Sequence, residues 1–331
     1  MRFDPPAAEL HIHIEGTLEP ELIYTLAERS GTQLPYRDIE DLRSRYEFDD
    51  LQSFLDLYYA NMQVLQTQQD FADMTAAYLG RAAAGGVRHV ELFFDPQAHL
   101  VRGVELKTVV DGIASVLSES EERFGVSTSL IACFLRDRDP QEALSVLEDL
   151  LEMEAPIIGV GLDSAERDYP PRLFQEVFEL AARHGLRRVA HAGEEGPAPY
   201  VWEALEVLGV ERVDHGVRSL EDPELVKHLA EQQVPLTVCP LSNVRLKGVS
   251  SLAEHPLPQL VEAGLLVSIN SDDPAYFGGY VEDNFRAIAE QFDLDAGDLA
   301  QLAKNSIASS FAGEERQREL TAAVDAWLAE A

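Results

Sequence analysis

Histidines are the residues of this sequence whose spacing points most directly to chemistry. His11 and His13 lie two positions apart in the apolar run ELHIHI, so in a β-strand both side chains would project from one face. His191 ends the run RRVAH, and His215 directly follows the run ERVD. Imidazoles at the ends of separate strands are the residues expected of a metal site.

Three carboxylates accompany these histidines. Glu194 follows His191 by three residues, and Asp272 and Asp273 follow the apolar run LLVSIN. Three imidazoles with one carboxylate suit Zn²⁺ or a similar divalent metal that keeps one position open for water. Such a metal lowers the pKa of bound water to about 7, which makes hydroxide available at neutral pH. We expect one aspartate to bind the metal, the other to contact substrate, and Glu194 to carry a proton.

Each of these motifs also has a plainer interpretation. A lone histidine is more often structural, Asp272 and Asp273 could form a solvated turn before Pro274, and Glu194 could be a carboxylate at a helix N-terminus. Their common position at strand ends favours a shared site, because active sites of α/β barrels lie at that end of the strands. A second, lysine-bridged metal is not expected, since no lysine ends a strand: the four are Lys107, Lys227, Lys247 and Lys304.

The elements that must position these residues alternate along the chain. Apolar runs predict strands at 9–14, 87–94, 127–134, 157–162, 187–191, 211–214, 235–239 and 265–270. Amphipathic segments predict helices at 20–30, 70–84, 105–123, 140–153, 171–185, 198–208, 221–232 and 256–263. Eight such units favour an α/β fold, the (β/α)8 TIM barrel. The alternative, a doubly wound open sheet, would need a Gly-rich turn after its first strand, and HIHIEGTLEP is not one.

One segment interrupts the alternation. Residues 36–68 are helical in pattern and carry an apolar stripe, so they predict either a helix packed on the barrel rim or a cap that excludes water from the site. The tail after residue 311 predicts a charged amphipathic helix, most simply a solvated one. We find no repeat or flexible linker, so we expect a single domain over 1–331 with a helical cap insertion at about 36–68.

Composition limits the partners. The 331 residues hold 59 Asp+Glu against 26 Lys+Arg, a formal charge of −33, which repels phosphate backbones and anionic lipid. We therefore expect no nucleic acid and no membrane partner, although an apolar rim would permit a homo-oligomer. Two cysteines in apolar runs and an N-terminus without a signal-peptide pattern predict a cytoplasmic protein. The acidic surplus itself suggests a surface adapted to high salt.

At this point the motifs resemble a known family. HIHIEGTLEP, GLDSAE, HAGEEGP, VDHGVR, CPLSNVRL and NSDDPAYFGGY occur in this order, from Glu9 to about Phe311. This series resembles the adenosine/adenine deaminase family of metal-dependent hydrolases, in the amidohydrolase superfamily. HIEGTLEP, CPLSNVRL, DDPAYFGGY and AKNSIASSF are closest to its microbial adenine deaminase branch.

The resemblance implies a role for each candidate residue. One Zn²⁺, or iron or manganese in its place, would be held by four ligands: His11, His13, His191 and Asp272. Glu194 would donate a proton to purine N1, and His215 would orient the attacking water and accept its proton. Asp273 would hydrogen-bond purine N7, and Gly161 would offer its backbone near N3.

The reaction implied is hydrolytic deamination of the free base adenine to hypoxanthine and ammonia, a step of purine salvage. Two alternatives stay open: deamination of adenosine or another N6- or N9-substituted purine, and a non-catalytic purine- or metal-binding protein. Glu15, Ser164 and Glu166 are candidate wall residues of the substrate pocket, with Phe54 and Tyr58 contributing from the cap.

Overall fold

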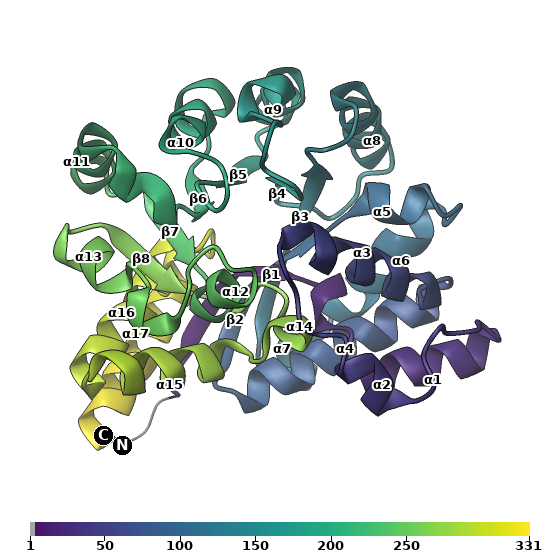
Figure 1. Cartoon of the computed structure of the whole chain (residues 1–331), viewed down its shortest axis with the longest axis horizontal. Coiled ribbons are helices and arrows are strands. Elements are labelled where there is room, and N and C mark those ends of the chain that lie inside the picture. Colours follow the sequence, from purple (N-terminus) through teal and green to yellow (C-terminus); the bar gives the residue numbers. More distant parts are fainter. Residues whose placement is uncertain (1–3) are drawn as a thin grey trace.

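A computed structural model describes residues 4–331 of the chain; residues 1–3, part of the N-terminal segment and of the expected domain, lie outside the described residues. All eight predicted strands form, each with bounds within two residues of those expected, and they pair in parallel in chain order (Figure 1). They are β1 (Ala7–His13), β2 (Val87–Phe94), β3 (Ser127–Leu135), β4 (Gly159–Asp163), β5 (Arg187–Ala192), β6 (Arg212–His215), β7 (Pro235–Val238) and β8 (Leu266–Ile269).

The sheet curves until its first strand meets the segment that follows its last. Ile12 in β1 bridges Asp272 in parallel, the backbone N–H of His13 donates to the carbonyl of Asp272 at 3.1 Å, and that of Asp272 donates to the carbonyl of His11 at 3.0 Å. The TIM barrel prediction is confirmed, and the open sheet is excluded. The hydrogen bonds that complete the barrel therefore join three residues expected at the site: His11, His13 and Asp272.

Helices surround the barrel (Figure 1). Several begin at proline, as α11 does at Pro223, where the Asp222 side chain accepts from the N–H of Glu224. The α-helices are α1 (Pro20–Ser30), α2 (Ile39–Arg43), α3 (Leu51–Asn61), α4 (Gln68–Ala84), α5 (Pro96–Leu100), α6 (Leu106–Leu117), α7 (Ser120–Phe124), α8 (Pro140–Glu152), α9 (Gln175–Arg183), α10 (Ala198–Glu203), α11 (Pro223–Gln232), α12 (Pro240–Arg245), α13 (Leu257–Glu262), α14 (Pro274–Phe277), α15 (Val281–Phe292), α16 (Ala296–Ser309) and α17 (Glu314–Glu330).

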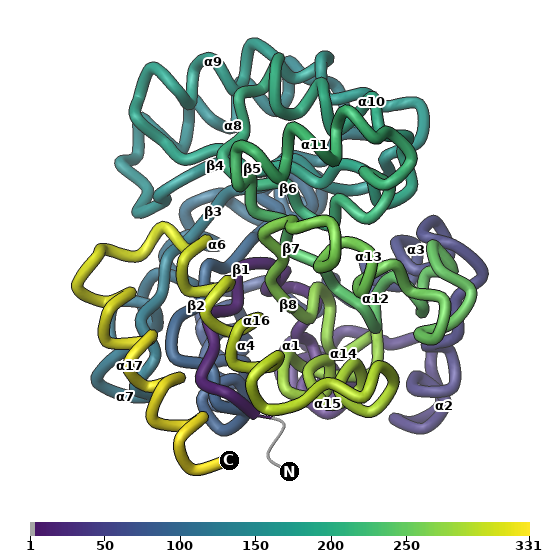
Figure 2. The backbone as a smooth tube through the Cα atoms, turned by 90° about the vertical axis from the view of Figure 1, so that its left-hand side faces the viewer, coloured from purple at the N-terminus to yellow at the C-terminus, as the bar shows by residue number. Residues whose placement is uncertain are grey.

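The helices differ from the predictions in several places. The segment 105–123 is two helices, α6 and α7, rather than one. The tail helix α17 is not a solvated helix, because Leu320, Val324 and Trp327 are buried and it packs against α16. The α16 helix, which was not predicted, packs in turn against both β1 and β8, so the end of the chain supports its beginning (Figure 2).

Part of the barrel interior below the site is apolar, and buried polar groups such as the Glu91–Arg212 ion pair lie among the strands as well. Phe93, Ile131, Cys133 and Val189 form a buried cluster separate from the larger core that includes the strands' outer faces and the surrounding helices. The centroid of the Phe93 ring lies 5.4 Å from that of the His11 ring, so this cluster forms an apolar floor directly below the histidines of the site.

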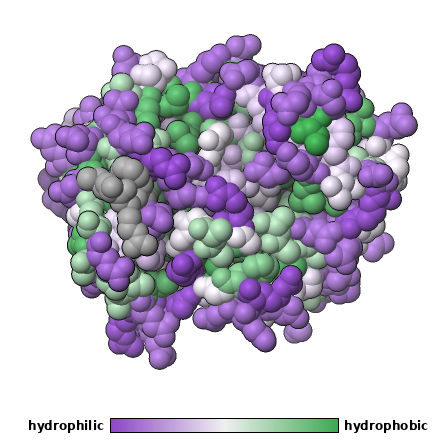
Figure 3. Space-filling view, turned by 90° about the horizontal axis from the view of Figure 1, so that it is seen from below, coloured by the Kyte–Doolittle hydropathy of each residue, from purple (hydrophilic) through white to green (hydrophobic). Residues whose placement is uncertain are grey.

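One face of the molecule is largely polar. Hydrophilic side chains dominate the face seen from below, with apolar patches between them (Figure 3). Within residues 4–331, none of the helices combines the length and the apolar character needed to cross a membrane.

Candidate metal centre and substrate pocket

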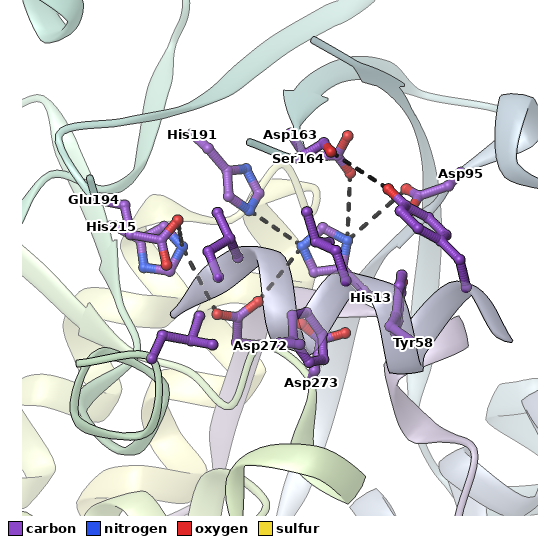
Figure 4. Close-up of a pocket in the computed structure, with 15 residues that line it drawn as sticks. His13, Tyr58, Asp95, Asp163, Ser164, His191, Glu194, His215, Asp272 and Asp273 are labelled. Carbon is purple, nitrogen blue, oxygen red and sulfur yellow. Dashed lines mark hydrogen bonds and ion pairs between the residues drawn. The ribbon is translucent and has the colours of Figure 1, made fainter. Parts of the chain in front are cut away.

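Four side chains from three parts of the barrel converge at the carboxyl ends of the strands. Nε2 of His13 lies 3.2 Å from Nε2 of His191 and 3.5 Å from Oδ1 of Asp272 (Figure 4). The same Oδ1 of Asp272 lies 3.3 Å from Nε2 of His11. One ligand atom from each residue lies within 4.8 Å of every other, and all four residues are buried. The structure thus brings together the four residues expected to bind a metal.

These residues fit a divalent cation. Nε2 of His11 is buried and has no hydrogen-bond partner in the described part of the chain, an arrangement that is costly unless something else is bound. Ligand atoms placed tetrahedrally at about 2.0–2.1 Å from a zinc ion are separated by about 3.3–3.4 Å, close to the spacings above. Three imidazole nitrogens and a carboxylate oxygen also match the donors that zinc prefers.

Acceptors lie behind each imidazole and were not predicted from the sequence. Nδ1 of His11 is 3.0 Å from the hydroxyl of Thr237, whose Oγ1 donates to Asp214. Nδ1 of His191 is 3.7 Å from Asp214, and Nδ1 of His13 is 3.5 Å from Asp163. An acceptor hydrogen-bonded to Nδ1, as Thr237 is to His11, fixes the tautomer so that Nε2 is free to bind the metal. The carboxylates near His13 and His191 face Nδ1 without a hydrogen bond in the described part of the chain.

Burial and mutual proximity keep most of the imidazoles neutral. Burial lowers the pKa of His13 to about 3, with the neighbouring His11 acting in the same direction. Burial and the adjacent histidines also lower the pKa of His191 well below its usual range. Burial opposes ionisation of Asp272, but His11 and His215 outweigh it and hold the pKa of that carboxyl well below its usual range. Neutral imidazoles and an ionised carboxylate are the forms that bind metals.

Glu194 and His215 lie beside the four convergent residues. Oε2 of Glu194 is 3.6 Å from Nε2 of His215, which is 3.7 Å from Oδ2 of Asp272 (Figure 4). Burial raises the pKa of Glu194 well above its usual range, and the charges of Asp272 and Glu166 raise it further. A carboxyl held neutral next to a metal site is suited to proton transfer.

Asp273 occupies the opposite side of the pocket. Its Oδ1 is buried and has no hydrogen-bond partner among the described residues, and burial beside Asp272 raises the pKa of this carboxyl well above its usual range. Glycine at position 16 is necessary for this placement, because a Cβ there would lie 1.9 Å from Oδ1 of Asp273. The glycine of HIHIEGT therefore makes room for a side chain that is more than 250 positions away in the sequence.

The pocket above these groups is closed by helix α3. Its walls include Leu51, Phe54, Leu55, Tyr58 and Tyr59 from that helix, and its volume is about 40 Å³. Helix α3 crosses in front of the convergent side chains (Figure 4). The part of the apolar stripe of residues 36–68 that lies on α3 therefore faces the site.

The candidate wall residues divide into two groups. Ser164, Phe54 and Tyr58 line the pocket, whereas Glu15 and Glu166 are buried behind it. Gly161 is not among the described residues that line the pocket: a Cβ there would meet Sγ of Cys133 at 2.4 Å, in the apolar floor. Ser164, three residues later, directly follows the end of the same strand.

Glu166 has a position that the sequence did not predict. Its carboxylate accepts hydrogen bonds from four successive backbone N–H groups, those of residues 193–196, at 2.7–3.0 Å. Glu194 is one of these four residues. A buried carboxylate thus fixes the loop that carries the proposed proton donor.

Left-handed backbone directs three side chains of the site. Ser164, His215 and Asp272 have φ values of 69°, 62° and 68°, at or after the ends of β4, β6 and β8. This conformation costs about 1–3 kcal/mol for a residue other than glycine, and such strain is concentrated at functional sites. The chain turns sharply at each strand end and leaves the side chain at the mouth of the barrel.

A TIM barrel with histidines and aspartate converging at the carboxyl ends of its strands is the architecture of the metal-dependent amidohydrolases. The family model described as "Adenosine deaminase" matches residues 6–327. A Streptomyces coelicolor protein named adenine deaminase is 59% identical over 94% of this chain and 92% of its own length. A similarly named Cupriavidus necator protein is 52% identical over 97% of this chain and 91% of its own.

Solved structures agree with these sequence relationships. The crystal structure of adenine deaminase from Arthrobacter aurescens matches with a TM-score of 0.98 and 62% identity, covering 99% of this chain and all of that one. A cog1816 amidohydrolase from Burkhoderia ambifaria, solved with bound Zn, matches with a TM-score of 0.91 and 28% identity over 99% of this chain and 92% of that one. The chain belongs to the adenosine deaminase family, whose members are hydrolases acting on C–N bonds.

Proposed function

We propose that this protein hydrolyses adenine to hypoxanthine and ammonia, with one zinc ion bound at the centre described above, in cytoplasmic purine salvage. The observation that carries the proposal is a buried carboxyl with a raised pKa, Glu194, lining the same pocket as His13, His191 and Asp272. The names of relatives more than half identical over nearly the whole chain support adenine as the substrate.

The proposed metal ligands are His11, His13, His191 and Asp272. Their fit is supported by the orphaned Nε2 of His11, and zinc in particular by the ion in the Burkhoderia ambifaria relative. A divalent ion bound there supplies Lewis acidity, which lowers the pKa of water to about 7.

The other residues would bind the purine and move protons. Glu194, held neutral, donates its proton to N1 and so makes C6 electrophilic. Asp273 donates a hydrogen bond to N7, which holds C6 over the metal ligands, and His215 orients the attacking water. Since Ser164 rather than Gly161 lines the pocket, we assign the wall near N3 to Ser164. Addition of water at C6 and loss of ammonia leave hypoxanthine.

The enclosure of the pocket supports a free base. The aromatic side chains of α3 line it on one side. A planar base requires less displacement of Phe54 and Tyr58 than a nucleoside does. Closure by α3 would also exclude bulk water during the reaction.

Ammonia release from a panel of purines tests the function. We expect the zinc-loaded protein to deaminate adenine with a kcat/KM at least about 100-fold above that for adenosine or N6-methyladenine. This ratio is larger than the discrimination that one additional small group on a substrate usually produces. Faster turnover of adenosine would replace the proposed substrate, and no turnover of any purine would reject the enzymatic function.

Metal analysis of a ligand variant tests the centre. His11→Ala should lose both the bound ion and all activity, because it removes one of the four ligands. His184→Ala is the control, since His184 lies at the exposed end of α9. Full metal content in His11→Ala would remove His11 from the ligand set, and iron or manganese in the native protein would correct the metal.

A further inference from the structure

A chain of hydrogen bonds runs from a backbone N–H to the imidazole of His215. The N–H of Leu257 donates to Nδ1 of His255 at 3.0 Å, Nε2 of His255 lies 3.1 Å from Oδ1 of Asn243, and Nδ2 of Asn243 lies 3.3 Å from Nδ1 of His215. Asn243, His255 and His215 are each no more than 2% exposed, so water does not compete for these atoms. Neither Asn243 nor His255 has a part in the function proposed above.

The backbone N–H of Leu257 determines which group is the donor in every hydrogen bond of this series. A backbone N–H can only donate, so Nδ1 of His255 has no proton and its single proton is on Nε2. That N–H needs an acceptor, which orients the amide of Asn243 with its oxygen toward His255 and its NH₂ toward His215. The NH₂ group then donates to Nδ1 of His215, which must be unprotonated.

The far side of His215 is consistent with this order. With Nδ1 acting as an acceptor, a neutral His215 carries its proton on Nε2, the atom that faces carboxylate oxygens of Glu194 at 3.6 Å and Asp272 at 3.7 Å. An N–H facing two carboxyl groups is favourable, whereas a bare nitrogen lone pair facing an ionised Asp272 is not.

We propose that Asn243 and His255 are positioning residues that lock His215 in its Nε2–H tautomer. His215 therefore donates a hydrogen bond toward the reacting centre and does not accept the proton of water at that atom. The acceptors that remain for this proton are the ionised carboxylate of Asp272 and that of Glu194 once it has protonated the purine. The catalytic consequence rests on the proposed deamination, but the tautomer itself does not.

Nuclear magnetic resonance of the histidine nitrogens tests the lock without substrate. Long-range ¹H–¹⁵N spectra of zinc-loaded, ¹⁵N-histidine-labelled protein, with His215 assigned by its loss in His215→Gln, should show a protonated Nε2 and a bare Nδ1. In Asn243→Asp, a carboxylate that can only accept should draw a proton onto Nδ1. We expect kcat for adenine to fall by at least about 100-fold with metal content unchanged, the cost of a catalytic histidine with its protons misplaced.

A second pair of variants keeps the test decisive if Asn243→Asp does not fold. In His255→Gln an amide can still accept from Leu257 and donate to Asn243, so kcat and the His215 spectrum should stay near wild type. His255→Leu removes both bonds and should lower kcat by about 10–100-fold, with little change in KM, and mix the His215 tautomers.

Two results would overturn the lock: a proton on Nδ1 of His215 in the wild type, or a His215 spectrum that neither Asn243→Asp nor His255→Leu changes. If the spectra behave as expected but no purine is deaminated, the tautomer assignment stands and the proposed function fails.

Discussion

Glu166 and Glu194 are two buried glutamates at the same loop, and their surroundings are opposite. The Glu166 carboxylate is fully buried and accepts four backbone N–H hydrogen bonds. Within residues 4–331, the structure gives the Glu194 carboxylate no hydrogen bond, and its Oε2 lies 3.6 Å from Nε2 of His215. The two residues even share a contact, since the N–H of Glu194 is one of the donors to Glu166.

The difference shows how one fold assigns separate roles to two identical side chains. The four N–H donors bind both oxygens of the Glu166 carboxylate, which therefore fixes the loop. Burial without donors disfavours charge, and the pKa of Glu194 is raised, chiefly by burial and then by Asp272 and Glu166. Glu166 thus helps to orient Glu194 and also helps to keep its proton in place.

The largest expected effect is the loss of turnover in Glu194→Gln. The amide keeps the shape of the side chain but has no acidic proton, so kcat for adenine should fall by about 10²–10⁴-fold while the metal stays bound. The control is Glu195→Gln, the same change at the next residue, whose side chain pairs with Arg167 at 3.4 Å. Steady-state ammonia release and metal analysis check both variants. Near-normal turnover in Glu194→Gln would remove this residue from the mechanism.

A smaller loss is expected in Glu166→Gln. The amide puts an NH₂ group against N–H donors of the loop, so residues 193–196 should exchange their amide hydrogens faster. The displacement of Glu194 should lower kcat by about 10–100-fold, the usual range for residues that orient a site. Hydrogen exchange distinguishes this effect from a general loss of structure, with the exposed Glu221→Gln as control. Unchanged exchange at 193–196 would show that the loop does not depend on Glu166.

Thermal stability should change in opposite directions in these two variants. The folded pKa of Glu194 is raised above its unfolded value, so the wild type loses stability as pH rises from about 4.5 through the folded pKa. Glutamine does not ionise, so the Glu194→Gln variant does not lose this stability as pH rises. The melting temperature of Glu194→Gln should therefore be a few degrees above that of the wild type at pH 8 and nearly equal to it at pH 5. The melting temperature of Glu166→Gln should be below that of the wild type at both pH values. Melting curves at the two pH values check this, and a pH-independent difference for Glu194→Gln would contradict it.

The fold and the convergent residues could be predicted because both follow from local patterns. Strands alternate with helices at regular spacing, and parallel strands in a barrel present their carboxyl ends at one rim, so residues at those ends meet. Histidine at the ends of β1, β5 and β6 was therefore sufficient to expect a metal centre.

The residues missed are those whose partners are set only by tertiary structure. Glu166 binds backbone N–H groups of a loop almost 30 residues away, and no side-chain pattern signals such a contact. Asp214 and Thr237 lie on neighbouring strands, which became visible only with the register of β6 on β7. Gly161, which only the family resemblance placed near N3, lies inside β4, two residues before Asp163 ends that strand.

The exposed carboxylates extend the comparison beyond the two buried glutamates, and they carry the smallest predicted effect. At a formal charge of −33 the surface repels itself, and this repulsion is screened as the Debye length falls from about 10 Å at 0.1 M to about 3 Å at 1 M salt. Melting temperatures should rise by a few degrees over that range. The kcat/KM for adenine, a neutral molecule bound among buried groups, should change little. Stability that falls or stays constant with salt would reject adaptation of the surface to salt, because only exposed charges respond to screening of this kind.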